Sequence, residues 1–177
     1  MRIAQKALKN TNLKLTVLPA FGQAEKLISL QNRYVAEAIT DADPKIHVLF
    51  VAHGIPQRSV DRGEDYPIRV ADTARAISHS LPETASWSLA FQSRLGPVKW
   101  TEPYIEDAIV THASADKTLV MVPLSFVADC LETLYDLDTV AKELAMKVGY
   151  KRVIRVRTYN DDPKFAKILL KIATSSS

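Results

Sequence analysis

The sequence has one cysteine, five glycines and no long run of apolar residues, and each scarcity excludes a class of protein. The single thiol, Cys130, cannot close an internal disulfide, and it cannot supply the several thiolates of an iron–sulfur cluster or a cysteine-rich zinc site. The longest apolar stretches, such as 48–52 and 119–123, are strand-sized, well short of the roughly 18 residues of a membrane-spanning helix. We therefore expect a protein of a reducing compartment, with a cytoplasmic address and no membrane span.

Several common catalytic motifs are also missing. The sequence holds no Gly-x-Gly-x-x-Gly, no phosphate loop of the Gly-Lys-Ser/Thr kind and no Gly-x-Ser-x-Gly elbow. The usual nucleotide-binding and acyl-transfer chemistries therefore lack the local residues that they need.

The net charge of +3 is unevenly spread over the 177 residues. Residues 1–20 carry four bases and no acid, and residues 150–177 carry seven bases and two acids, so the middle has a net charge of −6. Basic ends around an acidic middle fit an anionic ligand, an anionic lipid surface or nucleic acid, or simply two solvated end segments. With 47% hydrophobic and 24% charged positions and no linker, we expect one domain over residues 1–177.

Short runs rich in β-formers alternate with longer segments of helical period. This order predicts an α/β fold, a doubly wound and mostly parallel sheet with helices on both faces. The predicted strands are 13–18, 47–52, 87–92, 118–122 and 153–156. The predicted helices are 25–39, 67–80, 102–111, 131–148 and 163–173. Pro82 and Gly149 fall where helices should end, and Ser175 to Ser177 are expected to fray.

In an open parallel sheet, functional residues gather just beyond the carboxyl ends of the strands. His53 ends an apolar strand and is followed by Gly54 and Pro56, so its imidazole should lie on a tight turn at the sheet edge. An imidazole there can bind a metal ion or accept a proton, and the structural alternative is a bond to a backbone carbonyl. The other three histidines, which lack such surroundings, are expected to be structural: His47, His79 and His112.

Carboxylates gather where the helix over 131–148 should begin. Glu132 and Asp136 are four residues apart and project onto one face, where they repel unless a cation lies between them. One histidine with these carboxylates would make a loose divalent-metal site, able to release its metal as well as bind it. Alternatively, Asp129 caps the helix and the other acids are solvated.

The segment 91–97 follows another predicted strand and offers amides and a hydroxyl, with Trp100 just beyond it. A flat indole at the mouth of a cleft favours a large planar ligand, and Arg94 could bind a carboxylate. The alternative for Trp100 is an ordinary place in the core.

Four motifs occur together in one order along the chain. They are FVAHGIP (50–56), VDRGEDYP (60–67), FQSRLGP (91–97) with Trp100, and FVADCLETL (126–134). In this order they resemble the ferrochelatase family, over about residues 15 to 170. The resemblance is to the C-terminal one of that family's two similar α/β halves, and the N-terminal half is not part of it.

The resemblance implies insertion of ferrous iron into protoporphyrin IX or a related porphyrin, a step of haem biosynthesis. It implies that His53 and Glu132 are the opposed catalytic pair, which also faces the metal, and that Asp136 extends the metal path. It places the porphyrin groove at four residues: Gln92, Ser93, Leu95 and Trp100. Ferrous iron is then a substrate, and we expect neither a permanently bound cofactor nor an iron–sulfur cluster.

The sequence departs from the family at two positions. Val140 stands where many relatives carry a further acid, and Cys130 stands where some carry a histidine. The first departure weakens the outer metal path, while the pair His53 and Glu132 is unaffected.

Resemblance to one half also bears on the partners. The absent half normally supplies much of the porphyrin-gripping wall and the membrane-facing lip, so we expect a separate N-terminal half or a homodimer, with peripheral membrane contact as an alternative and no nucleic acid. Segment 15–18 and its neighbours should then expose an apolar patch. Two other functions stay open: a half-size homodimeric chelatase for another tetrapyrrole, and a non-catalytic porphyrin-binding remnant.

Overall fold

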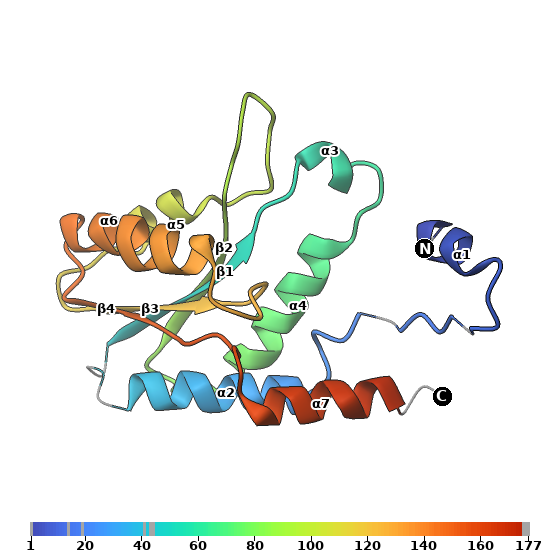
Figure 1. Ribbon diagram of the computed structural model, residues 1–177. Coiled ribbons are helices and arrows are strands. Elements are labelled where there is room, and N and C mark those ends of the chain that lie inside the picture. The colour runs from blue at the N-terminus through green and yellow to red at the C-terminus, as the bar shows by residue number, and fades with distance from the viewer. Residues whose placement is uncertain (1, 14, 19, 41, 43–44, 175–177) are drawn as a thin grey trace.

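The computed structural model describes residues 2–13, 15–18, 20–40, 42 and 45–174. Four strands form one sheet: β1 (Ile46–His53), β2 (Ser86–Gln92), β3 (Thr118–Pro123) and β4 (Arg152–Arg155). The strand order is β2-β1-β3-β4, and each neighbouring pair is parallel. The predicted α/β fold is confirmed (Figure 1).

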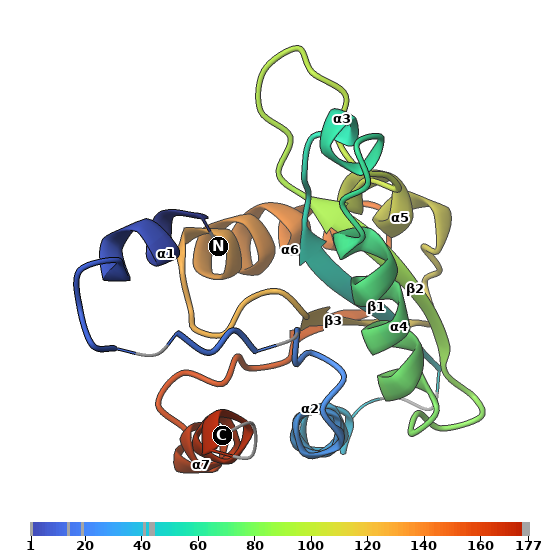
Figure 2. The ribbon, with the colours of Figure 1, turned by 90° about the vertical axis from the view of Figure 1, so that its right-hand side faces the viewer.

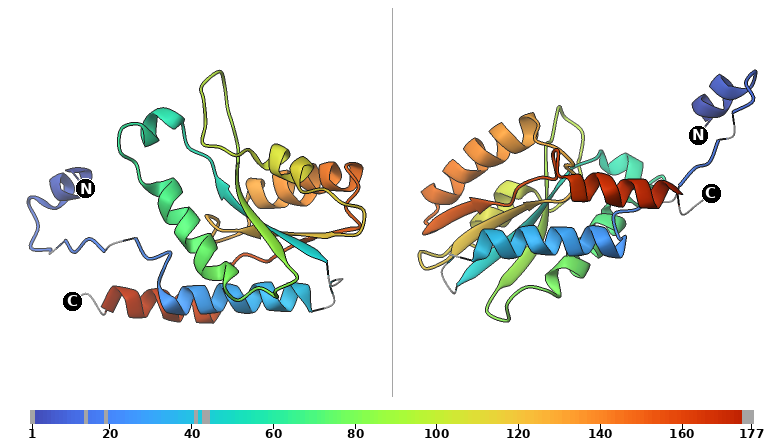
Figure 3. Two further views of the ribbon diagram at one scale, coloured as in Figure 1. Left: turned by 180° about the vertical axis from the view of Figure 1, so that it is seen from behind. Right: turned by 60° about the horizontal axis from the view of Figure 1, so that its bottom comes forward.

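Helices cover both faces of this sheet. One face packs against α2 (Glu25–Ile39), α4 (Tyr66–Ser78) and α7 (Pro163–Thr174), and the other against α5 (Ile105–Thr111), η1 (Glu132–Ala141) and α6 (Lys142–Lys147). Figure 1 shows α5 and α6 on one side of the strands and α2 and α7 on the other, and Figure 3 shows α2 and α7 side by side. The sheet is therefore doubly wound, as predicted.

The alternation of side chains along β1 explains why its whole run is apolar. Val48 and Phe50 belong to the core under α2 and α4, whereas Leu49 and Val51 belong to the core under α5 and η1. Successive side chains on a strand point to opposite faces, so a strand covered on both faces must be apolar throughout.

Local signals account for several helix ends. α4 ends at Ser78, before Pro82, and Gly149 follows α6 with a φ of +103°, a conformation that glycine adopts without steric cost. α7 starts at Pro163, and the Asp162 carboxylate accepts the Lys164 N–H at 2.7 Å. The expected frayed end, Ser175 to Ser177, lies outside the described residues.

The predicted strand over 13–18 is wrong. Its described residues, 13 and 15–18, form no strand, and Leu13, Leu15 and Val17 are exposed. An apolar run becomes a strand only where a sheet edge accepts its hydrogen bonds, and β2 and β4 are the edges of the sheet that the described residues form. Two short helices were not predicted, α1 (Arg2–Leu8), which lies apart from the sheet in Figure 1, and α3 (Gln57–Val60).

The helix predicted over 131–148 forms, with an unexpected winding. Its first ten residues are the π-helix η1, which continues into the α-helix α6. Hydrogen bonds from i to i+5 are rare in proteins and are found frequently at functional sites. No helix within the described ranges is long and apolar enough to cross a bilayer.

Candidate active site

The carboxyl edge of the sheet brings the predicted residues together. His53 is the last residue of β1 and pairs in register with Gln92, the last residue of β2. Val51 pairs with Pro123 at the end of β3, and the chain beyond Pro123 leads into η1. The parallel order of the strands therefore places three segments far apart in sequence at one edge.

The backbone of His53 is held from two neighbouring segments. Its N–H donates to Ser125 Oγ at 2.7 Å, and the Tyr66 hydroxyl donates to its carbonyl oxygen at 2.9 Å. The Phe126 ring stands edge-on to the imidazole, with 6.3 Å between ring centroids. The half-buried imidazole thus projects from a fixed turn. Tyr66, Ser125 and Phe126 were not singled out from the sequence, although Tyr66 and Phe126 lie inside the quoted motifs.

Gln92 lies behind the imidazole rather than in an open groove. Its side chain is 3% exposed, and its Nε2 lies 3.4 Å from His53 Nδ1. The Ser93 hydroxyl donates to Gln92 Oε1 at 2.7 Å and so orients the amide. With Nδ1 turned toward Gln92, Nε2 of His53 is the ring nitrogen that can meet a ligand.

Gly54 lets the two strand ends approach closely. Its N–H donates to the Gln92 carbonyl at 2.7 Å. A Cβ at position 54 would lie 2.9 Å from the Ser93 carbonyl oxygen and 3.1 Å from that of Gln92. A larger residue there would have to push β1 and β2 apart just beyond His53.

Glu132 and Asp136 lie in the first turns of η1, where the charge of His53 acts to lower the pKa of each carboxyl. The pKa of the Glu132 carboxyl is lowered, mainly by hydrogen bonds with the Cys130 side chain and the Glu132 backbone, with the charge of His53 adding to them. The pKa of Asp136 is raised by burial and by the negative charges of Glu132 and Glu106, which outweigh the opposite effect of His53. The site therefore pairs one firmly ionised carboxylate with one that holds its proton more readily.

The described residues form no ready-made metal site. Within the described residues, no group of three or more histidine, cysteine, aspartate or glutamate side chains lies close enough together to hold a metal ion. His53, Glu132 and Asp136 thus interact through their charges without forming a closed coordination shell, and their metal role remains a prediction.

A cavity of about 290 Å³ adjoins Asp136 between η1, α5 and the end of β2. Its polar lining comes from Gln92, Ser93, Arg94, Glu106 and Asp136. Val140, where the family resemblance led us to expect a further acid, lines the same cavity. Glu106 was not predicted as a site residue because nothing in the pattern of α5 distinguishes it from a solvated acid.

The loop after β2 folds back beside the turn that follows His53. The Trp100 indole N–H donates to the Leu95 carbonyl at 3.1 Å, and Trp100 bridges to Pro56. Leu95 itself is 81% exposed, and the Arg94 guanidinium lies 4.6 Å from the centre of the Tyr104 ring. Figure 2 shows this loop and α3 rising together above the carboxyl edge of the sheet. Of the four predicted groove residues, Gln92 and Ser93 therefore adjoin His53, whereas Leu95 and Trp100 belong to the raised loop.

Asp129 does not cap the helix. η1 begins after Leu131 without a side-chain cap, and the Asp129 carboxylate accepts from side chains, including Thr133, Arg155 and Asn160, and not from a backbone N–H of the helix. The alternative in which Asp129 serves only as an N-cap is therefore wrong.

Comparison with known proteins identifies the family of the chain. The family model described as ferrochelatase matches residues 1–177. A ferrochelatase of Synechococcus elongatus is 42% identical over 121 residues, 67% of this chain and 31% of that protein. Ferrochelatases of Geobacter metallireducens and Caulobacter vibrioides are 35% and 33% identical over 90% and 97% of this chain, and over 51% and 50% of their own lengths. The chain spans between about a third and a half of these relatives, and it belongs to the ferrochelatase family.

Proposed function

We propose that this chain is the metal-inserting half of a ferrochelatase, with ferrous iron and protoporphyrin IX or a related porphyrin as its substrates. The observation that carries the proposal is that His53, at the carboxyl edge of the sheet, lies near enough to Glu132 and Asp136 that its charge acts to lower the pKa of both carboxyls. The two acids stand on a π-helix, and the imidazole is oriented by Gln92.

The reaction removes two pyrrole protons as one ferrous ion enters the macrocycle, so the site must accept protons and deliver a cation. The His53 imidazole accepts a pyrrole proton, and its Nδ1 is the ring nitrogen that faces Gln92 Nε2. Glu132 holds the ferrous ion, since its lowered pKa keeps the carboxylate ionised. Asp136 binds the ion before it reaches Glu132, and its raised pKa makes Asp136 the more weakly binding carboxylate.

A second protein domain or subunit is needed to enclose the porphyrin. Large apolar side chains flank the site and are exposed, among them Leu95, Leu131, Leu134 and Tyr135. A planar apolar macrocycle is held well only when both of its faces are covered. A separate N-terminal half, or a second copy of this chain, supplies the other wall.

Anaerobic chelation by the purified chain tests the proposal. Loss of porphyrin fluorescence with ferrous iron or zinc measures insertion, and size-exclusion mass measured on the same sample gives the assembly state. We expect turnover by the chain alone as a dimer, or recovery of turnover on adding a separately expressed N-terminal half. Porphyrin binding without turnover in either arrangement would instead identify a non-catalytic binding domain.

Substitutions at the edge of the sheet test the assigned roles. His53→Ala and Glu132→Gln should each abolish insertion, a loss of at least about a hundredfold, because each removes a proton-transfer or metal-binding group. Asp136→Asn should cost less, and His79→Ala, which changes an exposed histidine at the end of α4, should cost nothing. Unchanged rates in both of the first two variants, with normal far-ultraviolet circular dichroism, would refute the assignment.

A further inference from the structure

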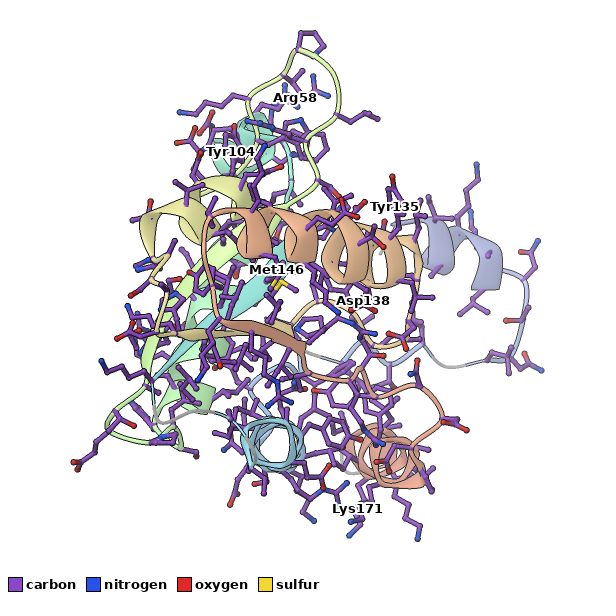
Figure 4. All side chains as sticks on the ribbon, turned by 90° about the vertical axis from the view of Figure 1, so that its left-hand side faces the viewer. Arg58, Tyr104, Tyr135, Asp138, Met146 and Lys171 are labelled. Carbon is purple, nitrogen blue, oxygen red and sulfur yellow. The ribbon has the colours of Figure 1, made fainter. Side chains whose placement is uncertain are left out.

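One arginine joins the π-helix, and the segment just before it, to the sheet. Arg155, the last residue of β4, donates from Nε to Asp138 Oδ1 at 2.7 Å and from Nη1 to Asp129 Oδ1 at 3.0 Å. Asp129 lies three residues before η1, and Asp138 lies within it. Figure 4 shows Asp138 on the side of this helix that faces the chain running from β4 to α7, with Tyr135 on the other side.

This ion-paired triad is partly withdrawn from water. The side chains of Arg155, Asp129 and Asp138 are 14%, 28% and 36% exposed. Hydrogen bonds between ionised partners in such a setting are stronger than those on an open surface and are screened less by salt. The triad is therefore able to constrain the backbone on either side of it.

The first anchor is itself rigidly held. Asp129 also accepts hydrogen bonds from the side chains of Thr133, Thr158 and Asn160 at 3.2, 3.1 and 3.0 Å. Burial alone would raise the pKa of Asp129, but these hydrogen bonds and the charge of Arg155 together lower it. The anchor thus stays an acceptor, with partners on β4, on the loop beyond it and, through Thr133, in η1 itself.

The bond from Arg155 to the second anchor, Asp138, requires that the helix advance only a short way along its axis between Glu132 and Asp138. The donors Nε and Nη1 belong to one planar group, so Arg155 can hold both carboxylates only if they converge. In an α-helix the six steps from Glu132 to Asp138 would advance about 9 Å along the axis. Winding with i to i+5 bonds places more residues in each turn, so the same six steps advance less and return Asp138 toward Asp129.

We propose that Arg155 is a positioning residue that selects the π winding of η1 by clamping Asp129 and Asp138 together. The winding determines where Glu132 and Asp136 stand relative to His53, so the clamp positions the acids of the site without touching a substrate. Leu137 and Ala141 anchor the helix in the core independently, and loss of the clamp should therefore loosen the backbone hydrogen bonds of η1 without releasing the helix from the sheet. Only the catalytic consequence of this inference rests on the proposed function.

Hydrogen exchange tests the clamp directly, without any activity. Arg155→Gln should speed amide exchange in residues 132–141 by about tenfold or more while β1 and β3 stay protected. Arg155→Lys should give a smaller effect, because an ammonium group can hold one carboxylate but lacks the fixed fork for two. Asp138→Asn should speed exchange around the second anchor and leave residues 127–130 unchanged.

The matched control is Arg75→Gln, which removes an arginine that pairs with Asp72 at 2.8 Å on the exposed face of α4. Its exchange in η1 should equal that of the wild type. If Arg155→Gln also leaves η1 exchange unchanged while the variant is folded, the clamp does not set the winding and the inference is overturned.

A functional readout separates this inference from the proposed function. In the assembly that turns over, Arg155→Gln should raise the KM for ferrous iron by about ten- to a hundredfold, the range expected when a residue that orients a ligand is lost, with the KM for porphyrin unchanged. Arg155→Lys should restore part of that loss. If the wild type shows no chelation, the proposed function fails, while the exchange experiment still decides whether Arg155 acts as a clamp. Equal rises in the KM for ferrous iron and the KM for porphyrin would show that Arg155 has only a general structural role.

Discussion

His47 and His53 occupy opposite ends of β1, and their surroundings give the same residue type different tasks. His47 is fully buried, with its Nδ1 and Nε2 at 2.8 and 2.9 Å from the hydroxyls of Ser86 and Ser88. It also stacks on His112, with ring centroids 4.2 Å apart. Burial, with the nearby charges of His112 and Lys117, lowers the pKa of His47 to about 3. His47 is therefore a neutral structural residue, in line with the expectation from the sequence.

The buried state of His47 makes the stability of the fold depend on pH. Between pH 6.5 and about 3 the unfolded chain binds a proton at this position that the folded chain does not, so stability falls as the pH falls. The slope from this one group is about 1.4 kcal/mol per pH unit. We expect His47→Gln to lose that component of the slope in urea unfolding measured from pH 7 to pH 4. His79→Gln, at an exposed histidine, should keep it, and equal slopes in all three proteins would contradict the prediction.

The role of Gly54 depends on the close approach of the chain after β1 to the end of β2. Gly54→Ala should destabilise the fold by about 1–3 kcal/mol, as overpacking does, because the new Cβ meets backbone oxygens that cannot move aside easily. Gly22→Ala is the matched control, since its Cβ would meet only the Thr73 hydroxyl at 3.4 Å. Urea midpoints of the two variants provide the comparison, and a stable Gly54→Ala protein would show that the strand ends can separate without cost.

At the scale of the elements, η1 shows what a periodic pattern can and cannot predict. Spacings of three and four predicted a helix over 131–148, and the helix forms. The same apolar positions are compatible with α or π winding, because the pattern records which side is buried and not how the hydrogen bonds run. The choice between windings depends on partners such as Arg155, which the pattern does not contain.

The packed face of η1 can be tested with two leucines of the same helix. Leu137 is fully buried under the sheet, whereas Leu134 is 54% exposed. Leu137→Ala should cost about 2–5 kcal/mol of unfolding free energy through lost burial and a residual cavity. Leu134→Ala should stay within about 0.5 kcal/mol of the wild type. Similar costs for the two, measured by chemical denaturation, would mean that η1 does not pack as described.

At the scale of the whole molecule, the chain leaves apolar side chains uncovered. Leu13, Leu15 and Val17 are exposed, as the patch expected around residues 15–18 requires, and a second set lies on and beside η1, including Leu131, Leu134 and Tyr135. Contiguous exposed apolar surface is characteristic of proteins that associate.

We therefore expect the purified chain to sediment above its monomer mass of 19.7 kDa as its concentration rises. The double change Leu131→Lys and Leu134→Lys should weaken this association, because it places charges in the patch beside the site. Leu170→Lys, on the exposed side of α7, is the matched control and should have no effect. Sedimentation of the wild type as a monomer at every concentration would contradict the expectation.

The sequence by itself determined the alternation of strands and helices and the residues at the strand ends, because apolar period and turn chemistry are local properties. His53 and Gln92 could therefore be found without a structure, as could the acids at the start of the long helix. Only the tertiary structure decided that residues 13 and 15–18 find no sheet edge, that η1 is wound as a π-helix, that Glu106 and Tyr66 reach the site, and that Arg155 reaches Asp129 and Asp138. These features depend on contacts between segments far apart in sequence, and such contacts are set by strand order and packing, which no single segment encodes.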